Sequence, residues 1–246
     1  MCRERRAGAK AHIIPKGFYR MIDPNFDEQI RVYTTDIDDR SPLRRTGAVD
    51  TSILCRECEQ RFQVCDDHAV KALSENPVPN MKWGHDKIHE LRGFRAEKLK
   101  LAFMHILWRA NESKLPDFDA IDLDGDGDRL RAFLWSDNAG SPADFAVILA
   151  LHPPDPDKHY LISPPYPHGK WENGARYLQM TIVRSVVFIT TSSIGLPSEY
   201  APYALATGAP IPVVLLPIGW RDSWTGQLLK ETSVRRMTRG SGGPRS

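Results

Sequence analysis

Cysteine is scarce in this chain and confined to its first part. The four cysteines, at positions 2, 55, 58 and 65, are too few and too clustered for the disulfide framework of a secreted protein. The opening residues are too charged for a secretory signal, and no later window reaches ~18 uninterrupted apolar residues. We therefore expect a cytoplasmic protein that does not enter a membrane, in which a Cys-x-x-Cys pair is more often a metal clip than a disulfide.

The chain also lacks a strong overall charge. Its 33 basic and 31 acidic residues leave a net charge of +2, with an isoelectric point near 8.3. A hydrophobic content of 41% and a charged content of 26% are ordinary for a globular protein, and 246 residues allow either one large domain or a small module joined to a larger one. Positive charge gathers only at the two ends, where it suits contact with phosphate, although a solvated tail has the same composition.

Hydrophobic periodicity indicates an α+β fold. Residues 57–73 and 95–113 repeat apolar side chains at three- and four-residue steps, so both are predicted helices. Proline-rich turns separate the later strands, which favours an antiparallel sheet over βαβ units. The predicted strands are 30–37, 48–55, 144–151, 159–163, 176–192 and 211–220. The predicted parts are 1–76, a small module; 77–139, a helical connector with core helices; 140–231, a strand-rich region; and 232–246, a basic disordered tail.

The pair Cys55-Arg-Glu-Cys58 lies where a predicted strand turns into a predicted helix. That position is typical of a zinc knuckle, because two thiolates share one site beside a helix N-terminus. A tetrahedral zinc needs four ligands, and Cys2 is the obvious third. Cys65 lies on the apolar face of the helix, which favours a small buried side chain over a ligand. The candidates for the fourth ligand are His12, His68 and Cys65.

Three stretches of the first half, "HIIPKGFYR", "LCRECEQRF" and "KLKLAFMHILWRA", carry a resemblance to a known family. A histidine before Ile-Pro, followed further along by a Cys-x-x-Cys that opens a helix, resembles the HNH endonucleases with their ββα-metal core. The chain looks especially close to a bacterial and phage-associated subgroup with the pattern C-x-x-C, S-H-I-I-P-K-x-x-Y-R, L-C-x-x-C-E-x-x-F. The resemblance implies a ββα-metal zinc module at the N-terminus, ahead of the helices and the sheet.

The resemblance also implies residue roles. His12 matches the general base that activates water, and Cys55 and Cys58 match the second pair of a structural zinc site with Cys2 from the first pair. Glu59 matches the helix position that binds a catalytic divalent ion such as Mg²⁺, where His or Asn is usual. His68 or Gln63 would join Glu59 if it shared its helix face.

Two positions depart from the family pattern. Arg5 stands where the first zinc pair has its second cysteine, and Ala11 stands where a nuclease has a metal-binding Asp or Glu. Two hypotheses follow. The protein is a metal-dependent endonuclease that cuts nucleic acid, with DNA as the expected substrate, or it is a zinc-containing module that binds nucleic acid or a protein partner without cutting. The expected nucleic-acid-binding residues are Arg3, Arg5, Arg6, Lys10, Lys16, Arg20 and Arg61.

Several weaker patterns remain. The stretch "DLDGDGD" at 122–128 resembles half of a calcium loop, but a turn that caps the next helix through Asp128 explains it better. His85 and His89 would share one face only if their segment were helical, and we interpret them as surface residues. Arg109 lies inside the most apolar helix, so an internal carboxylate is its expected partner. The strand-rich half has no catalytic motif and is a candidate surface for a protein partner.

Overall fold

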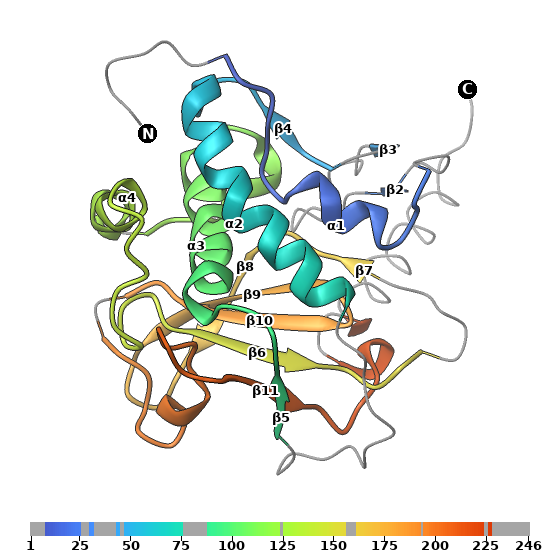
Figure 1. The fold of residues 1–246 in the computed structure, drawn as a ribbon, viewed down its shortest axis with the longest axis vertical. Coiled ribbons are helices and arrows are strands. Elements are labelled where there is room, and N and C mark those ends of the chain that lie inside the picture. Colours follow the sequence, from blue (N-terminus) through green and yellow to red (C-terminus); the bar gives the residue numbers. More distant parts are fainter. Residues whose placement is uncertain are drawn as a thin grey trace, which may run out of the picture.

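The computed structural model describes residues 8–25, 30–31, 43–44, 47–75, 88–123, 125–155, 161–192, 194–223 and 226–227. These residues form an α+β structure in which helices lie over one face of a seven-stranded mixed sheet (Figure 1). The α+β prediction is therefore confirmed at this level. The buried apolar side chains make one cluster that runs from Ala11 to Leu215, across the predicted boundaries at 76 and 139.

The N-terminal part contains two short antiparallel strands and the long helix that follows them. The strand of His12 pairs with the strand just before Cys55, and Cys55 is the N-cap residue of the helix. The helix boundary predicted from periodicity is confirmed to within one residue at each end. The elements in chain order are β1 (Ala11–His12), α1 (Lys16–Arg20), β2 (Ile30–Arg31), β3 (Leu43–Arg44), β4 (Val49–Asp50) and α2 (Arg56–Ser74).

Helix α1 packs against α2 through a close approach at Gly17. A Cβ atom at this position would lie 2.7 Å from Val70 Cγ2, so only glycine allows the two helices this near each other. Gly47 has a positive φ of 78°, and a side chain there would collide with the ring of Tyr19. Both glycines hold the segment after His12 close to α2 and β4.

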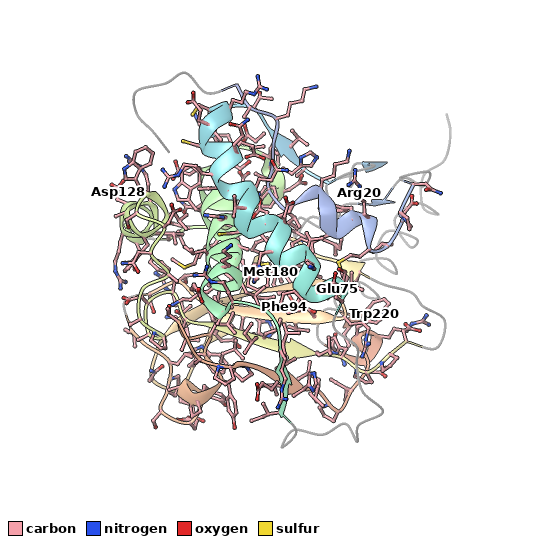
Figure 2. The ribbon with its side chains drawn as sticks, viewed as in Figure 1. Arg20, Glu75, Phe94, Asp128, Met180 and Trp220 are labelled. Carbon is pink, nitrogen blue, oxygen red and sulfur yellow. The ribbon has the colours of Figure 1, made fainter. Side chains whose placement is uncertain are left out.

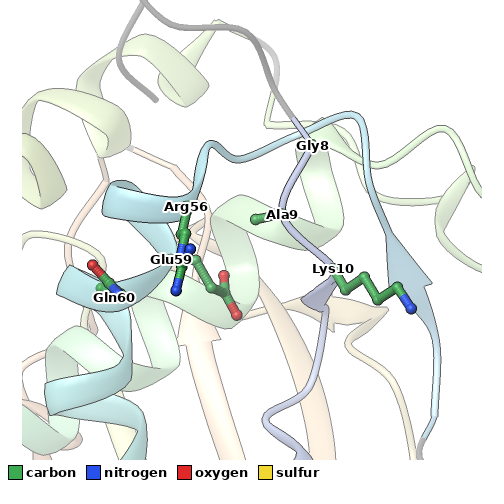
Figure 3. Close-up of a pocket in the computed structure, with 6 residues that line it drawn as sticks. All are labelled: Gly8, Ala9, Lys10, Arg56, Glu59 and Gln60. Atoms are coloured by element: carbon green, nitrogen blue, oxygen red, sulfur yellow. The ribbon is translucent and has the colours of Figure 1, made fainter.

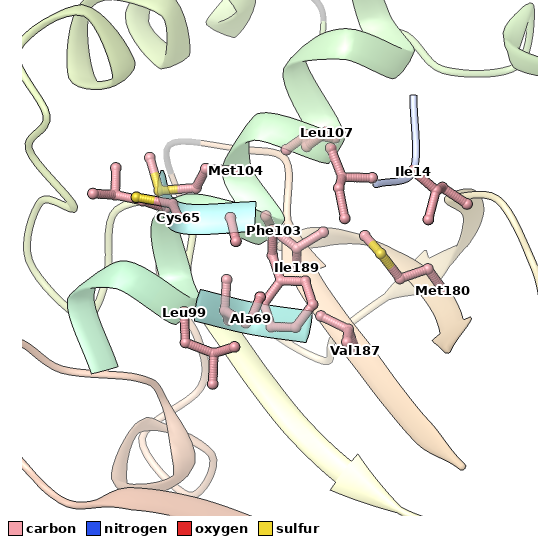
Figure 4. Close-up of a cluster of buried hydrophobic side chains, with 14 of the residues drawn as sticks. Ile14, Cys65, Ala69, Leu99, Phe103, Met104, Leu107, Met180, Val187 and Ile189 are labelled. Atoms are coloured by element: carbon pink, nitrogen blue, oxygen red, sulfur yellow. The ribbon is translucent and has the colours of Figure 1, made fainter. Parts of the chain in front are cut away.

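Helix α3 (Ala96–Glu112) is the centre of the molecule. All of its residues from Leu99 to Ala110 are buried, so every side of the helix faces protein rather than solvent. Figure 4 shows Leu99, Phe103 and Met104 among apolar side chains of α2 and of the sheet. Three ionisable residues, Lys100, His105 and Arg109, are enclosed in the same stretch.

The sheet has the order β5-β11-β6-β10-β9-β7, and β8 also pairs with β9. Side chains alternate between its faces, with Met180, Val187 and Ile189 on the face that meets the helices (Figures 2 and 4). The strands are β5 (Ile88–Leu91), β6 (Val147–Leu151), β7 (Leu161–Ile162), β8 (Tyr166–Lys170), β9 (Arg176–Val183), β10 (Ser185–Thr190) and β11 (Ile211–Leu215). The remaining elements are η1 (Pro116–Phe118), α4 (Asp126–Trp135), η2 (Ala201–Tyr203) and η3 (Trp220–Asp222).

The prediction of an antiparallel sheet is wrong at one junction. β11 pairs with β6 in parallel, with Val213 opposite Leu149, and the sheet is therefore mixed. The connection that allows this runs through the long segment after β10, which leaves the sheet and returns through η2. Proline-rich turns do not reveal such a crossover, because they mark where strands end and not where the next strand pairs.

Two local expectations also fail. The first concerns only the condition for a shared face, since His89 lies in strand β5 and not in a helix; the interpretation of His89 as a surface residue agrees with its partial exposure, and His85 lies outside the described residues. Asp128 does not cap α4, because the N-cap residue is Gly125 in the left-handed region. Asp128 lies inside the first turn and approaches Arg131 at 3.5 Å, and Asp126 lies 3.7 Å from Arg129.

Candidate active site

The segment that leads into β1 lies directly beside the start of α2. The backbone N–H groups of Gly8 and Ala9 both donate to the carbonyl of Leu54, at 3.1 and 3.0 Å. Three residues after Ala9, His12 lies opposite Val49 in the β1–β4 ladder. The chain around His12 and the first turns of α2 therefore form two sides of one region.

A cavity of about 500 Å³ opens between these two sides (Figure 3). In Figure 3 the Glu59 side chain extends from α2 toward the segment of Gly8 and Ala9, while Lys10 points the other way. One acidic and two basic residues are among those that line the cavity. The residues that line it are Gly8, Ala9, Lys10, Arg56, Glu59 and Gln60.

Glu59 is a half-buried carboxylate, and its Oε2 atom has no hydrogen-bond partner among the described residues. Burial raises the pKa of Glu59, an effect that the charge of Arg109 opposes and the charge of Asp66 increases. An unpaired, partly desolvated carboxylate is costly unless it has a function or a ligand. Its oxygen is the kind of donor that a divalent cation prefers.

His12 is half-buried at the end of β1. Burial lowers the pKa of His12, and the positive charges of Lys16 and Arg109 lower it further. The imidazole is therefore neutral at neutral pH and can accept a proton. Its backbone carbonyl accepts a hydrogen bond from Arg109 at 2.7 Å.

Ala11, where the family pattern has an acidic residue, is completely buried. Its partner across the ladder is Asp50, but that carboxylate is already engaged by Ser52 (2.6 Å from Oγ) and Ser113 (2.9 Å). Burial would raise the pKa of Asp50, but these hydrogen bonds outweigh it and hold the pKa below its usual value. Asp50 therefore serves to join β4 to the end of α3.

Cys55 and Cys58 lie together at the start of α2, and both thiols are buried. Cys55 Sγ is 4.0 Å from Glu57 Oε2, and no side chain caps the N-terminus of α2. Two soft donors three residues apart at a helix N-terminus fit half of a tetrahedral zinc site. Cys2, the expected third ligand, lies outside the described residues, among which no group of three or more His, Cys, Asp or Glu side chains is placed to hold a metal ion.

The structure does not bring His68 to Glu59. Nine residues of α2 separate them, which at 1.5 Å per residue is about 13 Å along the axis and half a turn out of phase. His68 Nε2 instead accepts a hydrogen bond from the backbone N–H of Arg95 at 3.0 Å. Gln63 is exposed and hydrogen-bonded to Asp67. The interpretation of Cys65 as a small buried side chain is confirmed, and burial raises the pKa of its thiol to about 11.

The predicted nucleic-acid-binding residues fall into three groups. Arg3, Arg5 and Arg6 lie outside the described residues. Arg61 is engaged elsewhere, because it donates to Trp135 O at 2.8 Å and to Asp137 at 3.0 Å, and its guanidinium lies over the Trp135 ring. The other three are exposed and lie in the segment that contains His12; they are Lys10, Lys16 and Arg20.

A buried ion pair close to this region was only half expected. Arg109 has the predicted internal carboxylate partner, which is Asp66 on α2. No sequence pattern indicates which acid this is, although Asp66 lies seven residues after Glu59 and therefore on the same face of the helix. The sequence feature that predicts an internal carboxylate is an arginine within a helix whose other residues are mostly apolar.

No helix among the described residues has the length and apolar character needed to cross a membrane. A scan of protein-family models and searches of curated proteins and of solved structures find no match to this chain.

Proposed function

We propose that the protein is a metal-dependent HNH-type endonuclease that hydrolyses phosphodiester bonds of nucleic acid, with DNA as the expected substrate. The observation that carries the proposal is the order β1, β4, α2, in which a neutral histidine at the end of β1 and an unpaired carboxylate on α2 belong to adjoining elements. This order agrees with the ββα-metal unit that the sequence pattern suggests. The cavity that Glu59 lines lies between the segment leading into β1 and the start of α2.

His12 is the general base in this proposal. A base must be unprotonated at the working pH and lie within hydrogen-bond reach of the attacking water. The lowered pKa of His12 meets the first condition. His12 is only half-buried, and its backbone carbonyl accepts a hydrogen bond from Arg109.

Glu59 is the residue that would hold a divalent cation. Its Oε2 atom has no hydrogen-bond partner among the described residues, and burial raises its pKa, so a bound cation would stabilise its charged form. When bound, such a cation stabilises the negative charge that develops on the leaving oxygen. Glu59 is the acidic residue among those that line the cavity.

Cys55 and Cys58 would hold a structural zinc together with Cys2. The thiols are buried at an uncapped helix N-terminus, where the helix dipole stabilises the thiolate form that zinc requires. The zinc has no catalytic part in this proposal. It would fix the start of α2, and with it Glu59.

Lys10, Lys16 and Arg20 are the residues that would contact the nucleic-acid backbone. Three exposed cations within one short segment suit phosphate contacts, which position a duplex without reading its sequence. Binding should therefore weaken strongly as salt increases.

One observation favours a second candidate function, a zinc module that binds nucleic acid without cutting it. Ala11 is fully buried and offers a methyl group where the family pattern has a ligand carboxylate, and Asp50 across the ladder is engaged by serines. Glu59 would then be the one acidic ligand from the described part of the chain. The exposed cations would still bind phosphate in this case.

Plasmid cleavage tests the proposal. The purified full-length protein is incubated with supercoiled DNA and Mg²⁺, Mn²⁺ or EDTA, beside His12→Ala and the control His89→Ala, which changes a histidine of edge strand β5. We expect metal-dependent cutting by the wild type and by His89→Ala, and none by His12→Ala. DNA binding that is equal in all three proteins, without any cutting, would contradict the nuclease and support the binding module.

A further inference from the structure

Arg109 is a fully buried cation in a helix that is surrounded by protein. It has no exposed surface, and every residue of α3 from Leu99 to Ala110 is buried with it. Removing a guanidinium from water is expensive, so it must be compensated by well-placed acceptors. The acceptors that it uses show which parts of the structure it connects.

The guanidinium of Arg109 connects three elements. Its Nη1 atom donates to the backbone carbonyl of His12 at 2.7 Å and lies 3.4 Å from that of Ile13. Its Nη2 atom donates to the carboxylate of Asp66 on α2. A single side chain of α3 thus ties strand β1 to helix α2.

Strand β1 needs such a tie, because its own pairing is short. Only Ala11 and His12 are in register with β4, and one further hydrogen bond joins Ile13 N–H to the carbonyl of Ala48. A two-residue ladder does little to fix a strand. Arg109, by contrast, presents planar donors in a fixed geometry that matches two acceptors at once.

The same ion pair also acts on Glu59. The charges of Arg109 and Asp66 both influence the Glu59 carboxylate, in opposite directions. Asp66 and Glu59 are two turns apart on one face of α2. The ion pair of Arg109 and Asp66 therefore joins the strand of the proposed base to the helix of the proposed cation ligand.

We infer that Arg109, held in place by Asp66, is the residue that positions His12 relative to α2. It contacts the backbone of the proposed base and not its imidazole, so it is a positioning residue. Its importance for cleavage depends on the proposed function, whereas its hold on β1 does not.

Hydrogen exchange and cleavage kinetics together test this inference. Arg109→Lys keeps the positive charge but loses the fork that grips two acceptors, and Asp66→Asn leaves Arg109 without its anchor. Lys100→Met is the matched control, because Lys100 is a second buried cation of α3 that donates to the carbonyl of Ser141, far from β1 in the sequence.

We expect the Ile13 amide to exchange at least about 10-fold faster in Arg109→Lys and in Asp66→Asn, the effect of weakening a charge-assisted hydrogen bond. In Lys100→Met the faster exchange should be confined to the loop around Ser141. Cleavage by Arg109→Lys should show a lower kcat with little change in KM, because the exposed cations that bind DNA are untouched.

Wild-type exchange at Ile13 in both Arg109→Lys and Asp66→Asn would overturn the inference, whether or not the protein cuts DNA. Faster exchange in a protein whose wild type does not cleave would reject the proposed nuclease and leave the hold of Arg109 on β1 established. Equal loss of kcat in Arg109→Lys and Lys100→Met would also overturn it, because the loss would then follow general destabilisation.

Discussion

Helix α3 has one buried cation near each of its ends, and the two cations differ in their hydrogen-bonded surroundings. Near the N-terminal end, Lys100 donates to Ser141 O at 2.6 Å beside Asp144, a carboxylate already engaged by the N–H and hydroxyl of Ser141 and by Arg129. Near the C-terminal end, Arg109 contacts Asp66 and β1, and several polar atoms around it have no hydrogen bond within the described part of the chain. These atoms are Asp66 Oδ1, both ring nitrogens of His105, Trp108 Nε1, Arg109 Nε and Glu59 Oε2.

The difference indicates two kinds of region. At the Lys100 end the Asp144 carboxylate holds a loop to a helix, and one buried atom, Arg129 Nη1, lacks a hydrogen bond among the described residues. Buried polar atoms without hydrogen-bond partners are uncommon in native proteins, and several close together indicate a functional region. The two ends therefore separate a structural clamp from the surroundings of the proposed site, and the variants below test that separation.

The largest effect on stability is expected from Asp66→Ala. This change leaves the Arg109 guanidinium buried without its carboxylate, which typically costs about 3–5 kcal/mol of unfolding free energy. Asp144→Ala, at the other end, removes a partly exposed partner of Arg129 and should cost about 1 kcal/mol. Urea denaturation of both proteins measures the contrast, and equal losses would remove the distinction between the two ends.

The next largest effect is a pH dependence at the Lys100 end. Burial lowers the pKa of Lys100 to about 8, below its ordinary value of 10.5, so between these values the unfolded chain binds the proton more tightly. Stability contributed by Lys100 therefore rises with pH through this window, by about 3 kcal/mol for a shift of this size. We expect the wild-type protein to gain this stability relative to Lys100→Met between pH 8 and 10.5, in denaturation curves recorded at each pH.

A smaller effect of the same kind is expected near Arg109. Burial lowers the pKa of His105 below 6.5, although Asp66, 3.8 Å away, opposes the shift. The unfolded chain therefore takes up the proton first, and stability falls as the pH decreases through 6.5 toward the lowered value. His105→Phe keeps a ring stacked on Phe62 and should lose less stability between pH 7 and pH 5 than the wild type does. An identical acid sensitivity of the two proteins would show that His105 is not its source.

The smallest change in stability is expected from Glu59→Gln, and it should be a gain. Removing the charge from a half-buried carboxylate with an orphaned oxygen should raise the unfolding free energy by about 1 kcal/mol or less. Cleavage should be lost in the same variant, because the proposed cation ligand is gone. Glu57→Gln changes an exposed residue of the same helix turn and is the control for both readouts.

The sequence predicted those features that depend on local periodicity. Helices α2 and α3, and strands β6, β9 and β10, lie within a few residues of their expected positions, because each has a regular apolar pattern. Strands β5 and β8 were missed, since Ile88–Leu91 and Tyr166–Lys170 mix charged, glycine and proline residues at a sheet edge. The parallel pairing of β6 with β11 depends on contacts distant in the chain, which no local pattern contains.

The candidate site was predicted to a similar degree. Motif spacing placed His12, Glu59, Cys55 and Cys58 in one region, and the structure places them on adjoining elements. Motif spacing could not place Asp66 beside Arg109, since that pairing depends on how α2 crosses α3. Helix phase alone could have removed His68 from the expected cation site, because a spacing of nine residues lies on opposite faces.

The most direct test of this account measures stability and cleavage together for Arg109→Lys and Lys100→Met. For each variant and the wild type, the unfolding free energy comes from urea denaturation and the cleavage rate from plasmid nicking at saturating DNA with Mg²⁺. The account predicts that Lys100→Met cuts like the wild type while folded, whatever its change in stability, whereas Arg109→Lys loses cleavage out of proportion to its stability. Cleavage that follows stability equally in both variants would contradict it.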